Sequence, residues 1–521
     1  MRARAILLIL ALSTTLAAGA AGKLLRYASQ FDPGTMDPHA LASLYHNRVA
    51  SQIYEPLVGR DEQFKAEPRL ALSWAPLDGG KGWRFKLRAG VKFQGGEPFT
   101  ADDVVFNVAR ALHPVSAYKT TLPNVTGTRK VDDLTVDLLT SQPTPVLPLA
   151  LTNLRLMSKA WAQKHKVEKP QDYKAKEETF SARNANGTGP FRLVSWEPDI
   201  KTVLVANEGY WGKHGNVAEA RYFVVGSAAT RVAALITGEM DIVVDPAVQD
   251  LERLRRVPDV RVDQTISTGT QYLGFDHARD TLKFGDAGGK NPFRDPRVRE
   301  AVRLAIDKAA LVKKVMRDTG TVSRAIYSQA IDGYDKRFDQ PTPYDPERAK
   351  ALLKEAGYAN GFAVELDCSL QQPADSIGQA VSGMLSRIGI RVSYRPLAFN
   401  ILLPKLNAGE TSLYIIGWTP ASAEPEGVLV PLVHARTASG AGEYNFGGYF
   451  NPKVDALIDR GRVEFDMARR HALFTEAMAL VDAETGFVPL MVRHVTWAMR
   501  KNVKAILRPN DIVDLRFVSL E

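Results

Sequence analysis

The sequence predicts an α/β fold in more than one domain. Segments in which apolar and polar residues alternate, as in strands, recur between segments with helical periodicity and helix caps. The chain has 521 residues, too many for one compact core, so we expect two or three domains. Its composition, 45% hydrophobic and 24% charged, is that of a globular protein.

The N-terminus reads as a cleaved export signal. Arg2 and Arg4 precede an apolar run over residues 5–12, and small residues follow, with Ala18-Gly19-Ala20 as the cleavage site. The run is too short to span a bilayer, and no later segment has enough uninterrupted apolar residues to do so. No cysteine follows the run, so a lipid anchor is not supported there. We therefore expect a soluble, periplasmic mature protein.

The first half of the chain alternates strands with helices. A helix is predicted where Leu41, Tyr45, Val49 and Ile53 recur every four residues. Thr100 with Asp103 forms a capping box that starts a second helix, and Ser227 caps a third. Strands are predicted at residues 24–27, 83–88, 134–138, 191–196, 202–205 and 240–244.

The second half repeats one helix-start signal. Asp295-Pro296, Asp345-Pro346 and Asn451-Pro452 each place a capping side chain before a proline, which at the first helical position loses no hydrogen bond. Residues 377–388 are a further helix and 390–394 a strand. A short apolar strand over residues 413–417 ends at Trp418.

Several classes of chemistry have no motif in the sequence. There is no G-x-S-x-G, Walker loop, G-x-G-x-x-G or H-E-x-x-H pattern. His39 and His46 lie seven apart without a third ligand nearby, so no metal or other cofactor is expected. Cys368, the only cysteine, is interpreted as a buried structural thiol.

The net charge does not indicate nucleic-acid binding. The formal charge is +9, and +7 once Arg2 and Arg4 leave with the signal. The basic residues are scattered and are not interleaved with aromatic residues, so we expect a solvated basic surface. Attraction to an acidic ligand or to a membrane is the weaker alternative.

Nine segments, in order, carry a family resemblance over nearly the whole chain from Leu24 onward. They read MDPHALASLYHNRVASQIYEPLV, WRFKLRAGVKFQGGEPFTADDVVF, GTGPFRLVSW, ALITGEMDIV, FRDPRVREAVRLAIDKAALV, YDPERAKALLKEAGY, GWTPASAEPE, YNFGGYFNPKVDALI and FVPLMVRHVTWAMRKNVK. The chain resembles the family 5 extracellular solute-binding proteins of ABC importers, which bind dipeptides, oligopeptides, nickel or glutathione. Most of these residues are interpreted as scaffold.

The resemblance implies a bilobal periplasmic-binding-protein fold with a hinge and an extra third domain. It places lobe I at 23–57, 185–284 and 490–521, the extra domain at 58–184, and lobe II at 285–489, after a signal peptide at 1–22. It implies capture of a peptide or peptide-like solute by closure of the lobes, delivery to ABC permease subunits, and no catalysis. A monomer is expected.

The resemblance also implies ligand-binding residues. The stretch Gly417-Trp418-Thr419 matches the segment whose backbone pairs with a bound peptide, with Trp418 as a wall of the pocket. The alternative is that Trp418 packs in the core of lobe II. In lobe I, the stretch 42–45, with Leu44 and Tyr45, matches a ligand-facing segment, and Tyr118 is a candidate from the extra domain.

One position departs from the family pattern. Ala421 stands where peptide binders carry the Asp that holds the peptide's α-ammonium group, and a buried ammonium without its carboxylate is costly. Either Glu424 or Glu426 holds the amine, or the ligand lacks one, as in an acylated or cyclic peptide, a glycoside or a metal chelate. Ser422 is a further ligand candidate, and His434 is the candidate for a nickel-type site.

Two other functions stay open. A secreted hydrolase on a similar scaffold would need a paired catalytic constellation, for which the sequence has no motif. A ligand sensor for a membrane receptor would also use closure, so the sequence does not separate sensing from import.

Overall fold

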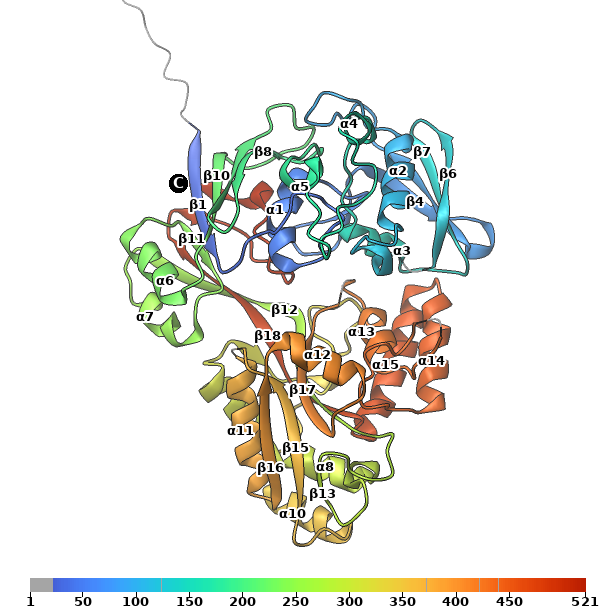
Figure 1. The fold of residues 1–521 in the computed structure, drawn as a ribbon, viewed down its shortest axis with the longest axis vertical. Helices are drawn as coiled ribbons and strands as arrows, with labels where there is room; N and C mark the ends of the chain where they lie inside the picture. The colour runs from blue at the N-terminus through green and yellow to red at the C-terminus, as the bar shows by residue number, and fades with distance from the viewer. Residues whose placement is uncertain (1–21, 123, 372, 421, 439) are drawn as a thin grey trace, which may run out of the picture.

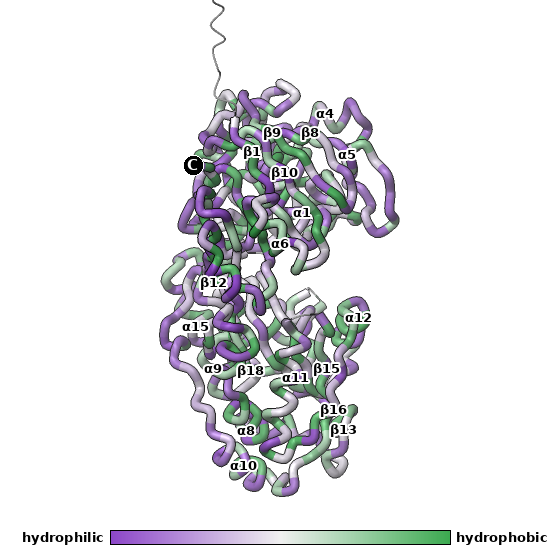
Figure 2. Tube along the Cα trace, turned by 90° about the vertical axis from the view of Figure 1, so that its left-hand side faces the viewer, coloured by the Kyte–Doolittle hydropathy of each residue, from purple (hydrophilic) through white to green (hydrophobic). Residues whose placement is uncertain are grey.

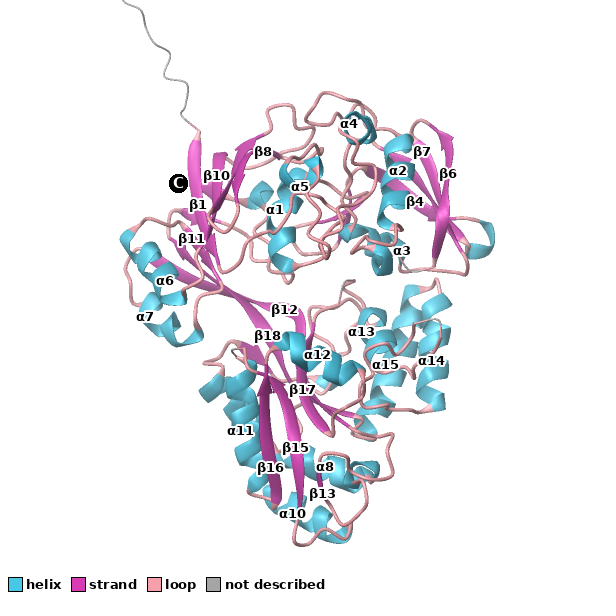
Figure 3. Cartoon of the chain, in the orientation of Figure 1, coloured by secondary structure: helices cyan, strands magenta, loops and turns pink. Residues whose placement is uncertain are grey.

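The protein consists of two bodies, one above the other, connected by two long strands (Figure 1, Figure 3). The computed structural model describes residues 22–122, 124–371, 373–420, 422–438 and 440–521. The predicted signal peptide therefore lies, except for its last residue, outside the described residues. We keep the expected names: lobe I and the extra domain form the upper body and lobe II forms the lower one.

One mixed sheet of 12 strands runs through both lobes. Its order is β13-β15-β17-β12-β18-β11-β1-β10-β9-β8, with β14 paired to β18 and β16 to β15. The strands β12 (Val260–Phe275) and β18 (Phe487–Arg500) are antiparallel partners and pass from one body into the other (Figure 1). They are the joint between the lobes.

Lobe I surrounds the upper part of this sheet. Its strands and helices are β1 (Lys23–Ser29), α1 (Leu44–Ile53), β8 (Phe191–Glu197), β9 (Lys201–Ala206), β10 (Val217–Val224), α6 (Ala228–Thr237), β11 (Ile242–Val244), α7 (Leu251–Arg255), β19 (Val503–Lys504) and β20 (Ser519–Leu520). The central strand β1 runs parallel to both of its neighbours, β10 and β11. Its Leu25 and Tyr27 are fully buried.

The extra domain has its own sheet, of order β4-β5-β7-β6. Its elements are β2 (Val58–Arg60), β3 (Ala66–Pro68), β4 (Ala71–Pro76), β5 (Gly82–Leu87), α2 (Ala101–Ala111), β6 (Val125–Asp132), β7 (Thr135–Thr140), α3 (Leu147–Ala150), α4 (Lys159–Lys164) and α5 (Phe180–Arg183). A separate apolar cluster, which includes Phe85, Val104 and Leu138, fills the space between this sheet and α2.

Lobe II surrounds the lower part of the large sheet. Its elements are β13 (Gly285–Asp286), α8 (Pro296–Ala305), α9 (Lys308–Ala310), β14 (Gly320–Thr321), α10 (Pro346–Glu355), β15 (Phe362–Ser369), α11 (Ala374–Ser386), β16 (Ile390–Leu397), α12 (Phe399–Asn407), β17 (Leu413–Trp418), α13 (Glu426–Leu432), α14 (Pro452–Val463) and α15 (Met467–Ala483). Two apolar clusters form its core, one around Leu366 and one around Phe474. Figure 2 shows apolar strands inside both bodies and polar stretches outside them.

The local helix signals in the sequence are confirmed. Asp295, Asp345 and Asn451 each accept a backbone N–H at the start of a helix with proline in its first turn. The capping box at Thr100 and Asp103 is present, and Ser227 caps α6. The first helix starts at Leu44, later than the Leu41 pattern suggested, because Ser43 is its N-cap.

Among the residues that the structure describes, no helix combines the length and apolarity that a membrane span requires.

Candidate ligand-binding site

A cleft of about 1810 Å³ lies between the lobes. From lobe I it is lined by Phe31, Leu44 and Tyr45, and from lobe II by Lys314, Gln379 and Thr419. The joint itself contributes Arg493 and His494 of β18. Residues from both bodies and from their joint thus face one space, which a movement of the lobes would reshape.

The predicted lobe I segment lies along this cleft. Ser43 caps α1 by accepting the N–H of His46, so Leu44 and Tyr45 occupy the first turn of the helix. The Tyr45 ring packs edge-on against Phe31, with 4.8 Å between ring centroids, and the Arg48 guanidinium lies 5.2 Å from the Tyr45 ring. Burial, then the nearby charge of Asp245, raises the pKa of Tyr45 to about 12, so its hydroxyl is neutral at physiological pH.

Tyr118 also lines the cleft but belongs to a fixed polar contact. Its hydroxyl donates to Asn47 Oδ1 at 2.9 Å, and Arg155 Nη1 donates to the same oxygen at 2.8 Å. Tyr118 as a whole is 2% exposed. Tyr118 therefore orients Asn47 and Arg155 more than it offers free surface to a ligand.

The segment after β17 divides into residues that line the cleft and residues behind it. Thr419 and Pro420 are part of the lining, whereas the described residues Gly417 and Trp418 are not. The Trp418 indole N–H donates to the Gly427 carbonyl at 2.9 Å, and its ring packs on Tyr444 with centroids 5.0 Å apart. In this conformation the partly buried Trp418 side chain packs against lobe II, and its predicted role as a wall of the pocket stays a prediction.

The backbone of the same segment retains a free edge. β17 pairs with β12 as far as Trp418, but it pairs with β15 only over residues 413–415. Beyond Ile415 its second edge has no strand partner within the described part of the chain. An extended ligand backbone needs such an edge to pair with a strand.

The two glutamates considered as substitute anchors are held inside lobe II. Glu424 is fully buried, and its Oε2 accepts from Arg470 Nε at 3.0 Å and from Nη2 at 2.7 Å. Glu426 pairs with the same guanidinium. Burial opposes ionisation of Glu424, but the His471 ring, 3.7 Å from its Oε1, and the charge of Arg470 outweigh burial and lower the pKa of Glu424. Neither carboxylate is part of the cleft lining.

The other predicted positions in this region contribute less. Ala421 lies outside the described residues, so the missing-anchor hypothesis stays a prediction. Ser422 is 8% exposed and is not a lining residue. His434 is 5% exposed, and its ring hydrogen-bonds the Ala435 carbonyl at 2.7 Å and Asp459 at 3.4 Å. Among the described residues no group of three or more His, Cys, Asp or Glu side chains is arranged for a metal ion.

A charged cluster on the lobe I side of the cleft was not predicted. Arg48, fully buried, donates to Asp245 at 2.8 Å and to Asp511 at 2.6 Å. Both aspartates line the cleft and have left-handed backbones, with φ of 58° each, which is uncommon for a residue other than glycine. Burial raises the pKa of Asp511 to about 6, with the charge of Arg48 opposing it and that of Asp245 adding to it.

Arg493 was missed as well. It lies on β18, and its only hydrogen bond within the described residues is a long one, 3.4 Å from Nη2 to Thr419 Oγ1. Its Nε is buried without a partner there. The signal that could have found it is the polar pair Arg493-His494 inside the apolar run FVPLMVRHVTWAM, because a charged side chain in a buried strand usually has a specific role.

Comparison with protein families gives one match that covers most of the chain. The model of the bacterial extracellular solute-binding proteins, family 5 middle region, matches residues 65–440. The chain belongs to this family. The predicted family resemblance is thus confirmed.

Relatives of known function have different ligands in their names. Heme-binding protein A of Haemophilus influenzae is 29% identical over 85% of this chain and 82% of the relative. The dipeptide-binding protein of Escherichia coli strain K12 is 26% identical over 94% of this chain and 93% of the relative. Identity at this level fits one family with several ligand classes.

Solved structures show the same fold. The periplasmic binding protein DppA of Helicobacter pylori, in complex with the peptide STSA, superposes with a TM-score of 0.78, 24% identity and coverage of 96% of this chain and 98% of that one. The predicted fold class, an α/β bilobal periplasmic-binding-protein fold, is confirmed.

Proposed function

We propose that this protein is the periplasmic solute-binding subunit of an ABC importer, capturing a peptide or peptide-like solute. The observation that carries the proposal is the cleft of about 1810 Å³ lined by both lobes and by the strands that join them. Closure of the lobes over a ligand there buries the solute and brings together surfaces of both lobes, which membrane permease subunits would recognise. Membership of the solute-binding family and the names of the peptide-binding relatives support this reading.

The position of the free strand edge supports a peptide-like ligand. Thr419 lines the cleft next to the unpaired edge of β17, so an extended solute could add main-chain hydrogen bonds along Gly417, Trp418 and Thr419. From lobe I, Leu44 and Tyr45 would contact it, and Tyr118 would act through Asn47.

A non-peptide solute is the second candidate. Arg470 already binds Glu424 and Glu426, so neither is available as a substitute for the acidic anchor that Ala421 replaces. A ligand without a free amine, such as an acylated or cyclic peptide, a glycoside or a metal chelate, needs no such anchor. If Ala421→Asp created binding of free-amine dipeptides, the missing-anchor hypothesis would gain support.

Export, cleavage near Ala20, a monomeric state and the absence of catalysis are part of the same proposal. The alternative of a secreted hydrolase predicts turnover of a released solute, whereas a binding subunit returns the solute unchanged.

The test is native mass spectrometry of the protein purified from the periplasm, followed by small-angle scattering with and without the released solute. A solute that travels with the protein and reduces its radius of gyration supports the proposal. A solute that is chemically converted, or a radius that does not respond to any co-purifying solute, contradicts it.

A further inference from the structure

The cleft carries far more positive than negative charge. The described residues that line it include nine Lys and Arg side chains but four carboxylates, an excess of five positive charges. Charges that line a concave, partly desolvated space create a stronger potential than charges scattered over a surface. The sign of the cleft therefore bears on which solutes enter it.

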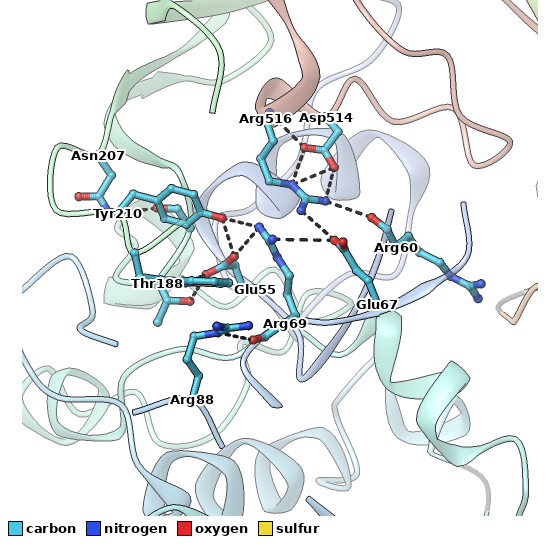
Figure 4. A network of polar contacts seen from close by, with 12 residues as sticks. Glu55, Arg60, Glu67, Arg69, Arg88, Thr188, Asn207, Tyr210, Asp514 and Arg516 are labelled. Carbon is cyan, nitrogen blue, oxygen red and sulfur yellow. Dashed lines mark hydrogen bonds and ion pairs between the residues drawn. The ribbon is translucent and has the colours of Figure 1, made fainter. Parts of the chain in front are cut away.

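Three of these cations are neutralised by neighbouring carboxylates. Figure 4 shows Arg69 between Glu55 and Glu67, and Arg516 bound to Asp514 and Glu67. Arg508 donates to Asp514 at 2.5 Å. This network fixes the extra domain against the C-terminal segment, and its charges nearly cancel.

The remaining cations are different. Within the described residues no carboxylate lies at ion-pair distance from any of them: Arg60, Arg155, Arg231, Lys314, Arg317 and Arg493. Arg60, Arg155 and Arg231 are at most 7% exposed, and they donate to carbonyl oxygens or to Asn47. A buried guanidinium that has dipoles but no anion beside it is incompletely compensated.

Of these six cations, Arg493 is the one whose charge we consider most available to a ligand. Among the residues that the structure describes, it has neither a carboxylate partner nor a short hydrogen bond. It lies at the joint, between Thr419 of lobe II and the Asp245–Asp511 pair of lobe I. Those two carboxylates share Arg48, and Arg231 donates to the Asp245 backbone carbonyl. The three arginines and two aspartates of this group together carry one net positive charge. Burial lowers the pKa of Arg493, and the two aspartates counteract this, so it stays charged.

We propose that the solute captured by this cleft is anionic, and that Arg493 binds one of its carboxylate or phosphate groups. A planar guanidinium matches the two oxygens of such a group in a bidentate pair. Among the described residues, the Nε of Arg493 has no partner and its Nη2 holds only a long contact of 3.4 Å with Thr419 Oγ1, so both donors can be given to a ligand. Lys314 and Arg317, exposed on the lobe II side, attract a second negative group during entry. The inference rests on the proposed solute-binding function and deepens it.

Calorimetry with three matched tripeptides tests the charge preference. Glu-Ala-Glu, Gln-Ala-Gln and Lys-Ala-Lys have similar lengths, and the first two differ in charge with almost the same shape. We expect the acidic peptide to bind about ten-fold or more tightly than the glutamine peptide, with an advantage that shrinks as salt is added.

Arg493→Gln should reduce the affinity of the acidic peptide by about ten- to a hundred-fold, the loss of one charge-assisted pair, and leave the glutamine peptide almost unaffected. Arg192→Gln is the matched control, because Arg192 is exposed on β8 and is not a lining residue. Inorganic phosphate as a competitor separates a phosphate preference from a carboxylate preference.

The outcomes separate the inference from the proposed function. Tighter binding of the glutamine or lysine peptide overturns the inference and leaves the solute-binding function intact. If no tripeptide binds, the charge of the co-purifying solute decides: an anion supports the inference and removes tripeptides as ligands, and a neutral or cationic solute overturns it. If nothing binds and nothing co-purifies, the proposed function fails and the inference fails with it.

Discussion

The buried ion pair between Arg470 and Glu424 allows a direct test of what holds the loop between β17 and α13 in place. Both side chains are fully buried, and the guanidinium also donates to Gly461 O at 2.5 Å and pairs with Glu426. Glu424 lies near the end of the loop that leads from Thr419 to α13, which begins at Glu426. We therefore predict that this pair stabilises lobe II and shapes the loop but does not contact the ligand.

Arg470→Met removes the cation and leaves two carboxylates without their main partner. Breaking a buried pair in this way typically costs about 3–5 kcal/mol, because the remaining charge is desolvated and uncompensated. Glu424→Gln keeps the shape and leaves Arg470 its contact with Glu426, so we expect a smaller loss of about 1–3 kcal/mol. The double variant should recover part of the loss, because no unpaired charge remains at position 424.

The assay is urea unfolding followed by circular dichroism, with ligand affinity measured on each variant below the unfolding transition. Glu347→Gln, which removes a carboxylate from an exposed pair with Lys350, is the control and should change neither quantity. If Glu424→Gln lowered ligand affinity ten-fold or more while leaving stability intact, Glu424 would be a ligand anchor and the structural reading would be wrong.

Three further predictions concern pH, closure and the thiol. The pKa of Asp511 in the folded protein, about 6, lies above its ordinary value of 3.8. Between about pH 4 and 6 the folded protein therefore binds more protons at this residue than the unfolded chain does. The stability that this proton contributes is lost as the pH rises through this window. An anionic ligand should bind more tightly near pH 5.5 than at pH 7, where Asp511 carries its negative charge. Calorimetry that shows no gain in affinity at pH 5.5, or the same gain in Asp511→Asn, would contradict this. Phe465 of lobe II packs against Trp83 of the extra domain, with 5.9 Å between the ring centroids, and such an aromatic contact is worth about 0.5–1.5 kcal/mol. Phe465→Ala removes this contact between the two bodies, so small-angle scattering should show a larger radius of gyration. An unchanged radius would refute this prediction. Burial raises the pKa of Cys368 to about 12, so we expect no reaction with a thiol reagent at pH 8 until denaturant is added, and rapid labelling of the folded protein would show the thiol to be accessible.

The helix starts were predictable because their signals are local. Asp295, Asp345 and Asn451 cap helices through backbone N–H groups only two or three residues away, so the sequence contains the whole interaction. The strands of the joint were not predicted as continuous elements. β12 and β18 pair residues more than 200 positions apart, and their length of 16 and 14 residues depends on that pairing.

Contacts between residues far apart in the sequence limit the prediction of the candidate site even more strongly. Tyr45 was placed in the ligand cleft because the family resemblance aligned its segment, but nothing local connects Arg48 with Asp245 and Asp511, which are 197 and 463 residues away. The left-handed backbone of the two aspartates is likewise invisible in their side-chain type. The role of Trp418 stays a prediction, since a tryptophan at the end of a strand fits a pocket wall and a loop support equally well.

Arg493 connects recognition of the ligand with movement of the lobes. It lies on β18 where the pairing with β12 shifts register, between Ile266 and Thr270, and such bulges let a strand pair bend. A β-carbon added at Gly269 would stand 2.9 Å from Arg493 Nη2 and 2.7 Å from Thr419 Oγ1, so the bulge, the cation and lobe II meet at one point. A ligand whose anionic group binds Arg493 and whose backbone pairs with lobe II makes both sets of contacts only when the lobes approach each other. A ligand shifts the equilibrium between two conformations by as much as its affinities for them differ. The residue that we propose to select the charge of the solute is therefore also placed to make closure depend on it.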